Sequence, residues 1–275
     1  MRRQTGLVWV ARHSLAIAFA AAFVLPLVFI VLTAVMPEEQ TLTPELWPRH
    51  WEWGNLAAVF QKAPMAQWFL NTMIYAVLAS VFTLLASVPA AYALARYRFR
   101  GSNVAFLLVV AMMLLPPQVL VVPMYLVWAS LGLTGTIWPL VLPMLFGDAF
   151  SIFLLRQFLL TIPDDYADAA RIDGCGEFRT LWWVILPMLR PALAAVGLFT
   201  FFYAWNDYYG PLIYVSEQPS HWTLSIGLAS FKSIHAVQWN LTMAATLIVM
   251  APLIVVFFFA QKAFIEGVTL TGVKG

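Results

Sequence analysis

Long apolar runs separated by short polar segments dominate the hydrophobic pattern of this chain. A helix needs roughly 20 mostly apolar residues to cross the hydrocarbon of a bilayer. Runs of about this length occur six times, at residues 14–36, 69–95, 104–127, 137–160, 191–212 and 241–264. The pattern therefore predicts an all-α integral membrane protein with six transmembrane helices, in a single domain that spans residues 1–275.

Two of these runs carry features that need an interpretation. Basic residues precede the run 14–36, as in a signal peptide, but this run is long enough to span a bilayer and five more follow it. We therefore expect a retained first helix. The fourth run contains Pro139, Pro143, Gly147 and Asp148, and it is expected to be the least regular of the six.

The composition supports a lipid-covered surface, because 62% of the residues are hydrophobic and 10% are charged. A water-soluble protein of 275 residues would carry more charge. The net charge of +2 gives no indication of nucleic-acid binding. The single cysteine, Cys175, has no second Cys or clustered His beside it, so we expect neither a disulfide nor a metal site.

Lys and Arg residues gather on one side of the predicted membrane helices. Twelve of the 15 lie on the side that holds both termini and the segment 161–190. The three on the other side are Arg49, Lys62 and Lys232. Because basic residues accumulate in cytoplasmic loops, both termini are predicted to be cytoplasmic.

The one large connection on that side, residues 161–190, predicts a helix, a sharp turn and a second helix. Asp164 and Asp165 fall in the first turn, where carboxylates favour the positive helix end. Gly174 is expected to end this helix, because glycine readily takes the left-handed conformation of a C-cap. The second helical stretch is predicted from about Glu177.

These residues resemble the cytoplasmic loop of the permease subunits of binding-protein-dependent ABC importers, which reads Glu-Ala-Ala, three further residues ending in Asp, then Gly and spaced prolines. The matching positions here are Asp168, Ala169, Ala170, Asp173, Gly174, Leu186, Pro187 and Pro191. Asp168 replaces the usual Glu, and Leu181 replaces a common Phe. The resemblance implies the six-helix type I importer permease fold, in which this loop is a coupling helix that docks on a cytoplasmic ATPase.

Further residues are similar to the second permease of maltose-type sugar importers. They are Asn71-Thr72, Ala91 to Arg96, Phe99, Gly101, Trp205-Asn206-Asp207, Pro211-Leu212 and the ending from Gly267 to Gly275. The resemblance implies a subunit of an importer that carries a sugar or oligosaccharide across the bacterial inner membrane. It also implies a second permease subunit, an ATPase dimer and an extracytoplasmic sugar-binding protein or lipoprotein as partners, besides membrane lipid.

The tail, residues 265–275, is polar and rich in glycine. In importers of the resembled family, a tail of this kind can reach the ATPase dimer. A frayed terminus would have the same composition. The sequence leaves both interpretations open.

The chain has no Walker A pattern, so ATP and Mg²⁺ are expected in the partner ATPase. The chain itself is then expected to need no cofactor, to hold no catalytic residue and not to be an enzyme. This expectation places the energy source of the resembled importer outside this polypeptide.

Polar residues inside the predicted spans are candidates for contacts with a substrate, because ionisable groups in a membrane usually face a cavity or each other. The candidates are Asp148, Trp205, Asn206, Asp207 and Tyr208. Acceptor groups beside aromatic faces suit sugar hydroxyls and rings. Asn206 and Asp207 could instead be a structural pair or a helix cap, and Asp148 could be satisfied by a neighbouring helix or by water.

Other functions remain open on the sequence. A permease of the same build could carry a glycerol phosphate ester, although basic residues would then be expected in the cavity and the spans offer only Arg156. An intramembrane enzyme or ion-driven carrier is disfavoured, because no H-E-x-x-H pair, inverted repeat or carboxylate series is visible. The segment 161–190 could also be an amphipathic connector at the membrane surface, with Trp182 and Trp183 as interfacial anchors.

Overall fold

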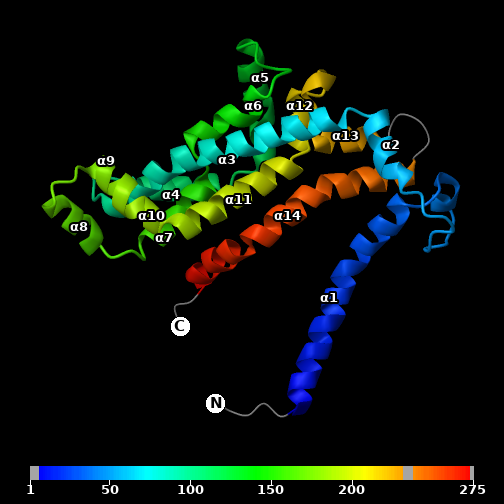
Figure 1. Ribbon diagram of the computed structural model, residues 1–275. Coiled ribbons are helices and arrows are strands. Elements are labelled where there is room, and N and C mark those ends of the chain that lie inside the picture. The colour runs from blue at the N-terminus through cyan, green and yellow to red at the C-terminus, as the bar shows by residue number, and fades with distance from the viewer. Residues whose placement is uncertain (1–5, 232–237, 273–275) are drawn as a thin grey trace. The chain divides into compact units, whose positions relative to one another are not determined.

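The computed structural model describes residues 6–231 and 238–272, with side chains described for 8–231 and 238–261 (Figure 1). These residues form helices and turns without a β-strand, which confirms the predicted all-α fold class. The α-helices are α1 (Gly6–Ala34), α2 (Gly54–Lys62), α3 (Met65–Arg96), α4 (Ser102–Met112), α5 (Val121–Ser130), α6 (Trp138–Val141), α7 (Ala149–Leu159), α8 (Asp165–Ile172), α9 (Glu177–Arg179), α10 (Leu186–Met188), α11 (Arg190–Asn206), α12 (Tyr209–Tyr214), α13 (Leu224–Ser230) and α14 (Trp239–Gly272). Short 3₁₀ segments are η1 (Glu38–Leu42), η2 (Pro117–Leu120), η3 (Leu142–Phe146) and η5 (Pro219–His221), and η4 (Thr180–Ile185) is a π-helical segment.

Within the described residues, four helical stretches are long and apolar enough to cross a membrane without a partner helix. They are Val8–Ala34, Met65–Arg96, Trp138–Leu159 and Trp239–Gln261. Two further spans form if each of two bent helix pairs counts as one span, namely Ser102–Met112 with Pro117–Ser130 and Glu177–Met188 with Arg190–Asn206. By length and composition this part of the chain therefore offers up to six spans, the number that the apolar pattern predicts.

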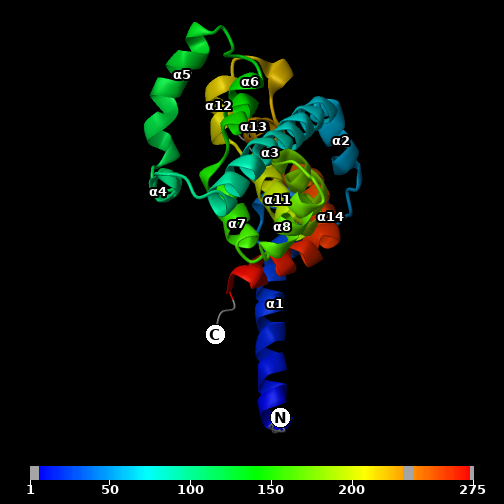
Figure 2. The same cartoon turned by 90° about the vertical axis from the view of Figure 1, so that its left-hand side faces the viewer.

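The third predicted span, 104–127, is not one straight helix. Its two parts meet at 93°, and Figure 2 shows α4 and α5 on either side of this bend. Pro116 and Pro117 lie at the break. Neither proline has the backbone N–H that would continue the hydrogen bonds of α4, so the helix ends before them.

The last two predicted spans also differ in their helix ends. The run 191–212 divides into α11 and α12, which are separated at Asp207 and Tyr208. Helix α14 continues past 264 to Gly272 and so includes most of the predicted tail. The end of that tail, residues 273–275, lies outside the described residues.

The chain divides into two compact units, and the first comprises residues 1–66 and 227–252. Asn55 of α2 fixes the chain that follows α1, because its Nδ2 donates to the carbonyl oxygens of Ala34 at 3.0 Å and Met36 at 2.9 Å. None of residues 8–32 of α1 is buried, and burial begins only at its end, with Thr33 and Ala34. A helix that is apolar on all sides and uncovered is typical of a lipid environment.

The second unit comprises residues 67–226 and 253–275. Helices α3, α7 and α11 run side by side in it, as both views show (Figures 1 and 2), and η4 packs against them. Their shared core is built from buried residues of these four elements, of the turn after α7 and of the residue before α11: Val88, Ala91, Tyr92, Ile152, Leu155, Leu159, Ile162, Leu181, Ile185, Leu189, Ala192 and Val196. This core fixes the position of η4, on which α8 rests.

Candidate functional site

The first candidate site is the elbow, which we define as residues 164–177, formed by α8 and the turn after it. Gly174 ends α8 in the left-handed region, with φ at +82°. Its N–H donates to the Arg171 carbonyl at 3.0 Å, and the N–H of Cys175 donates to the Ala170 carbonyl at 2.9 Å. These two bonds are those of a Schellman C-cap, so the helix end predicted at Gly174 is confirmed.

The elbow is closed by a chain of ion pairs and hydrogen bonds. Arg171 donates from Nη1 to Asp168 Oδ1 at 2.7 Å and from Nε to Glu177 Oε1 at 2.9 Å. Glu177 in turn accepts from the Tyr97 hydroxyl at 2.8 Å. Arg171 therefore ties α8 to the start of the next helix, and Tyr97 ties both to the end of α3.

Two pKa shifts agree with this arrangement. The hydrogen bond to Glu177 raises the pKa of Arg171 above its usual value. Burial, followed by the hydrogen bond to Glu177, raises the pKa of Tyr97 to about 12. Tyr97 is therefore a protonated donor at physiological pH and keeps its hydrogen bond to the carboxylate.

We expect Glu177→Gln to loosen the elbow, because it removes the charge that holds both Arg171 and Tyr97. Exposed ion pairs stabilise only modestly, so amide hydrogen exchange across 165–177 should become faster by up to about fivefold. Glu217→Gln, at an exposed carboxylate outside the elbow, is the matched control and should leave that exchange unchanged. Equal exchange in the two variants would contradict a closing role for Glu177.

The two alanines of the motif face different ways. Ala170 is 6% exposed and Ala167 is 2% exposed, and α8 packs on η4. Ala169 is exposed, as is Asp173. Only Ala169 is thus available for close approach by another chain, while Ala170 permits close approach between α8 and the rest of its own unit.

Arg96 holds the start of the elbow against the end of α3. Its side chain is 7% exposed, makes an ion pair with Asp164, and donates from Nη2 to the carbonyl oxygens of Leu159 at 3.1 Å and Ile162 at 2.8 Å. The Ile162 carbonyl thereby gains a donor, and the Leu159 carbonyl, which also accepts the Ile162 N–H at 3.2 Å, gains a second one. The sequence pattern alone does not mark Arg96, Tyr97, Arg171 or Glu177 as site residues.

The predicted coupling residues are partly brought together. Asp168, Ala169, Ala170, Asp173 and Gly174 all lie on the elbow, while Pro187 is exposed in α10, the helical turn before α11. The spacing of Asp168 and Arg171 is the i, i+3 spacing of a helix pair, and it is the sequence signal that could have identified Arg171.

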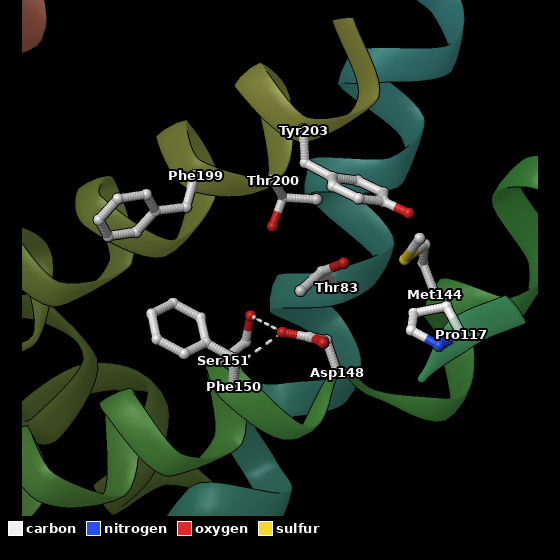
Figure 3. A pocket seen from close by; sticks show the side chains of 9 residues that line it. All are labelled: Thr83, Pro117, Met144, Asp148, Phe150, Ser151, Phe199, Thr200 and Tyr203. Atoms are coloured by element: carbon white, nitrogen blue, oxygen red, sulfur yellow. Dashed lines mark hydrogen bonds between the residues drawn. The ribbon is translucent and has the colours of Figure 1, made fainter. Parts of the chain in front are cut away.

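The second candidate site is a pocket of about 400 Å³ in the second unit, lined by residues of α3, α7 and α11 and by Pro117 and Met144 (Figure 3). Asp148 lies at the start of α7 and accepts on Oδ2 from the Ser151 N–H at 2.8 Å and from the Ser151 hydroxyl at 2.6 Å. Gly147, with φ at +85°, makes the turn before it. Asp148 is thus the N-cap of α7 and also lines the pocket.

The other predicted substrate-pathway residues do not line this pocket. Asp207 accepts from the Tyr75 hydroxyl at 2.9 Å and from the Gly210 N–H at 3.0 Å, and so joins α3 to the start of α12. Asn206 donates to the Phe202 carbonyl at 2.8 Å. Trp205 is 1% exposed, whereas Tyr208 is exposed. Of the five, Asp148 alone is among the residues that line the pocket of Figure 3.

Comparison with known proteins places this chain among the membrane components of transport systems. The family of binding-protein-dependent transport system inner membrane components matches residues 84–269. The AraQ permease protein of an arabinooligosaccharides transport system from Halalkalibacterium halodurans is 32% identical over 283 residues and covers 100% of both chains. UgpE, an sn-glycerol-3-phosphate transport system permease protein from Yersinia pestis, is 34% identical over 223 residues, 78% of this chain and 79% of UgpE.

A solved structure is similar to the whole fold. It comes from a bacterial ABC transporter involved in the import of the acidic polysaccharide alginate, and the similarity has a TM-score of 0.82 at 22% identity. It covers 96% of this chain and 99% of that chain. At this identity the similarity shows the fold, and the predicted importer permease fold is confirmed.

Proposed function

Because the chain belongs to the inner membrane components of binding-protein-dependent transport systems, we propose that it is a membrane subunit of an ABC importer that carries a sugar or oligosaccharide into the cytoplasm. A second permease subunit completes the pathway, and an extracytoplasmic sugar-binding protein or lipoprotein delivers the cargo. An ATPase dimer binds ATP and Mg²⁺ and supplies the energy. Both termini and the elbow lie in the cytoplasm, and the chain spans the bacterial inner membrane.

The observation that carries this proposal is the geometry of the elbow. A short helix with an exposed acidic and alanine face ends in a tight turn, and the Arg96–Asp164 ion pair and the Tyr97–Glu177 hydrogen bond hold the elbow to the end of α3. Arg96 in turn donates to the Leu159 carbonyl at the end of α7. A force applied to α8 from outside is then passed to helices α3, α7 and α11, which share one core. This is what a subunit that receives its energy from an ATPase requires.

The proposed class of cargo is based on the names of the relatives and on how much of this chain each one aligns with. The AraQ relative, named for arabinooligosaccharides, aligns with the whole chain, while UgpE, named for sn-glycerol-3-phosphate, aligns with 78% of it. The pocket of Figure 3 has no Lys or Arg among its lining residues, and a phosphate ester would favour them. We therefore propose a sugar as the cargo, with a glycerol phosphate ester as the alternative.

The proposal is tested by reconstituting the chain with its partner subunits in liposomes that contain ATP. Uptake of an arabinooligosaccharide should require this chain, the ATPase, ATP and the loaded binding protein together, and omission of any one should stop it. Uptake by this chain without the other subunits would overturn the proposal. Uptake of glycerol 3-phosphate in place of the sugar would overturn the cargo and leave the coupling intact.

A further inference from the structure

The pocket of Figure 3 combines one carboxylate with hydroxyl groups and aromatic faces in the middle of three membrane helices. Its volume of about 400 Å³ is in the range of small-molecule sites. Phe150 and Phe199 meet edge to face at 5.8 Å between ring centroids, and Tyr203 is 59% exposed. Such rings offer flat surfaces to the C–H faces of a sugar.

Two polar atoms at this pocket have no hydrogen-bond partner among the described residues. Asp148 uses Oδ2 for Ser151, and no hydrogen bond to its Oδ1 is found among the described residues. Thr83 of α3 is fully buried, and its Oγ1 has no partner in the part of the chain that the structure describes. Figure 3 places Thr83 between Asp148 and Thr200, inside the pocket. A buried hydroxyl without a partner is costly unless a ligand or water satisfies it.

The start of α7 would ordinarily attract an anion, because helix N-termini present free N–H groups and a positive dipole end. Here that position is already taken by the protein, since Asp148 accepts the Ser151 N–H at 2.8 Å. The pocket therefore holds the Asp148 carboxylate at the N-terminus of α7, a position where a broken membrane helix would otherwise bind a negatively charged ligand. A phosphate or carboxylate entering it would meet like charge.

The nearest basic residue of α7 does not offset this charge. Arg156 donates from Nε to the Leu94 carbonyl at 3.1 Å, and its guanidinium lies 3.9 Å from the centroid of the Phe106 ring. It is not among the residues that line the pocket. The electrostatic character of the pocket is thus set by Asp148.

We propose that this pocket is an electrostatic filter on the transport path, in which Asp148 Oδ1 and Thr83 Oγ1 bind hydroxyl groups of an uncharged sugar while the Asp148 charge excludes solutes that carry phosphate or carboxylate. The inference rests on the proposed function, because it needs the pocket to face the path of a cargo. It adds the charge class of that cargo and the residue that selects it.

The filter is tested by thiol accessibility in the assembled transporter. Cys175→Ser removes the single native thiol, and Thr200→Cys adds one in the pocket. Two methanethiosulfonate reagents of similar size, one with a trimethylammonium group and one with a sulfonate, are applied to membrane vesicles, and labelling of this chain is followed by mass spectrometry. The labelling rate of each reagent is divided by the rate at which the same reagent reacts with free 2-mercaptoethanol, which corrects for its intrinsic reactivity. The ratio compared below is that of the corrected rate of the cationic reagent to that of the anionic one.

The expected result is a preference for the cation. One unit charge about 6 Å away changes the local concentration of a monovalent reagent about threefold in a water-like medium, so the two reagents should differ about tenfold. Asp148→Asn keeps an N-cap acceptor for Ser151 and should reduce the ratio to about one. Ser220→Cys, at an exposed position that does not line the pocket, is the surface control and should show a ratio near one.

Three results would overturn the filter. These are a ratio near one for the Thr200→Cys thiol with Asp148 intact, no labelling by either reagent, or an unchanged ratio after Asp148→Asn. Only the last of these results depends on the folding of Asp148→Asn, and it is measured on assembled complexes alone. ATP-driven sugar uptake by the parent complex tests the proposed function separately. Normal uptake together with a labelling ratio near one would therefore reject the filter but not the importer function.

Discussion

Gly174→Pro is expected to abolish ATP-driven uptake while the subunit remains inserted and assembled with the second permease. Gly174 has φ at +82° and donates its N–H to the Arg171 carbonyl at 3.0 Å. Proline fixes φ near −65° and has no N–H, so both features are lost at a cost of about 3 kcal/mol or more. That cost corresponds to a fall of about a hundredfold in the population of the native turn.

Loss of the native turn should reduce uptake because the chain after α8 then leaves the helix in a different direction. Once the turn opens, Glu177 no longer meets Arg171, so the Tyr97–Glu177 hydrogen bond no longer ties α8 to the end of α3 and the Arg96–Asp164 ion pair is left to hold it there. Gly174→Asn is the matched control, because a Cβ at this position meets nothing within 4 Å and Asn tolerates the left-handed region. Uptake should be measured on equal amounts of membrane-inserted subunit. Normal uptake by Gly174→Pro would show that the turn has no part in coupling.

The parts of the structure that the sequence predicts are those governed by local rules. Membrane helices follow from runs of apolar residues, because a helix in lipid must satisfy its own backbone and needs no particular partner. The C-cap at Gly174 follows in the same way, since few residues other than glycine adopt φ near +80° without strain. Pro116 and Pro117 could likewise have indicated the break between α4 and α5.

The parts that sequence reasoning missed depend on contacts between distant segments. The Tyr75 hydroxyl reaches Asp207 across 132 positions of the chain, and Tyr97 reaches Glu177 across 80. No periodicity predicts such pairs. The same holds for Ala170, which could be assigned to an inner or outer face only after the packing of α8 on η4 was known. The motif gives the residues of the elbow, and the fold decides which of them face outward.

This division of faces leads to different expectations for the two neighbouring alanines. Ala170→Leu should overpack the contact between α8 and η4, because Ala170 is 6% exposed. Overpacking costs about 1–3 kcal/mol, which corresponds to a fall of roughly fivefold to a hundredfold in uptake. The effect lies within the subunit, so amide exchange across 165–177 should rise even in the absence of the ATPase.

Ala169→Leu should reduce uptake by a different route. Ala169 is exposed, so a larger side chain there fits the isolated subunit and leaves amide exchange across 165–177 unchanged. It is the docked ATPase that would meet the added bulk, and copurification of the ATPase with the permease subunits should fall. If Ala170→Leu left exchange unchanged and Ala169→Leu raised it, α8 would be rotated relative to the helix described here. If neither variant altered uptake or ATPase copurification, the elbow would not be the docking surface.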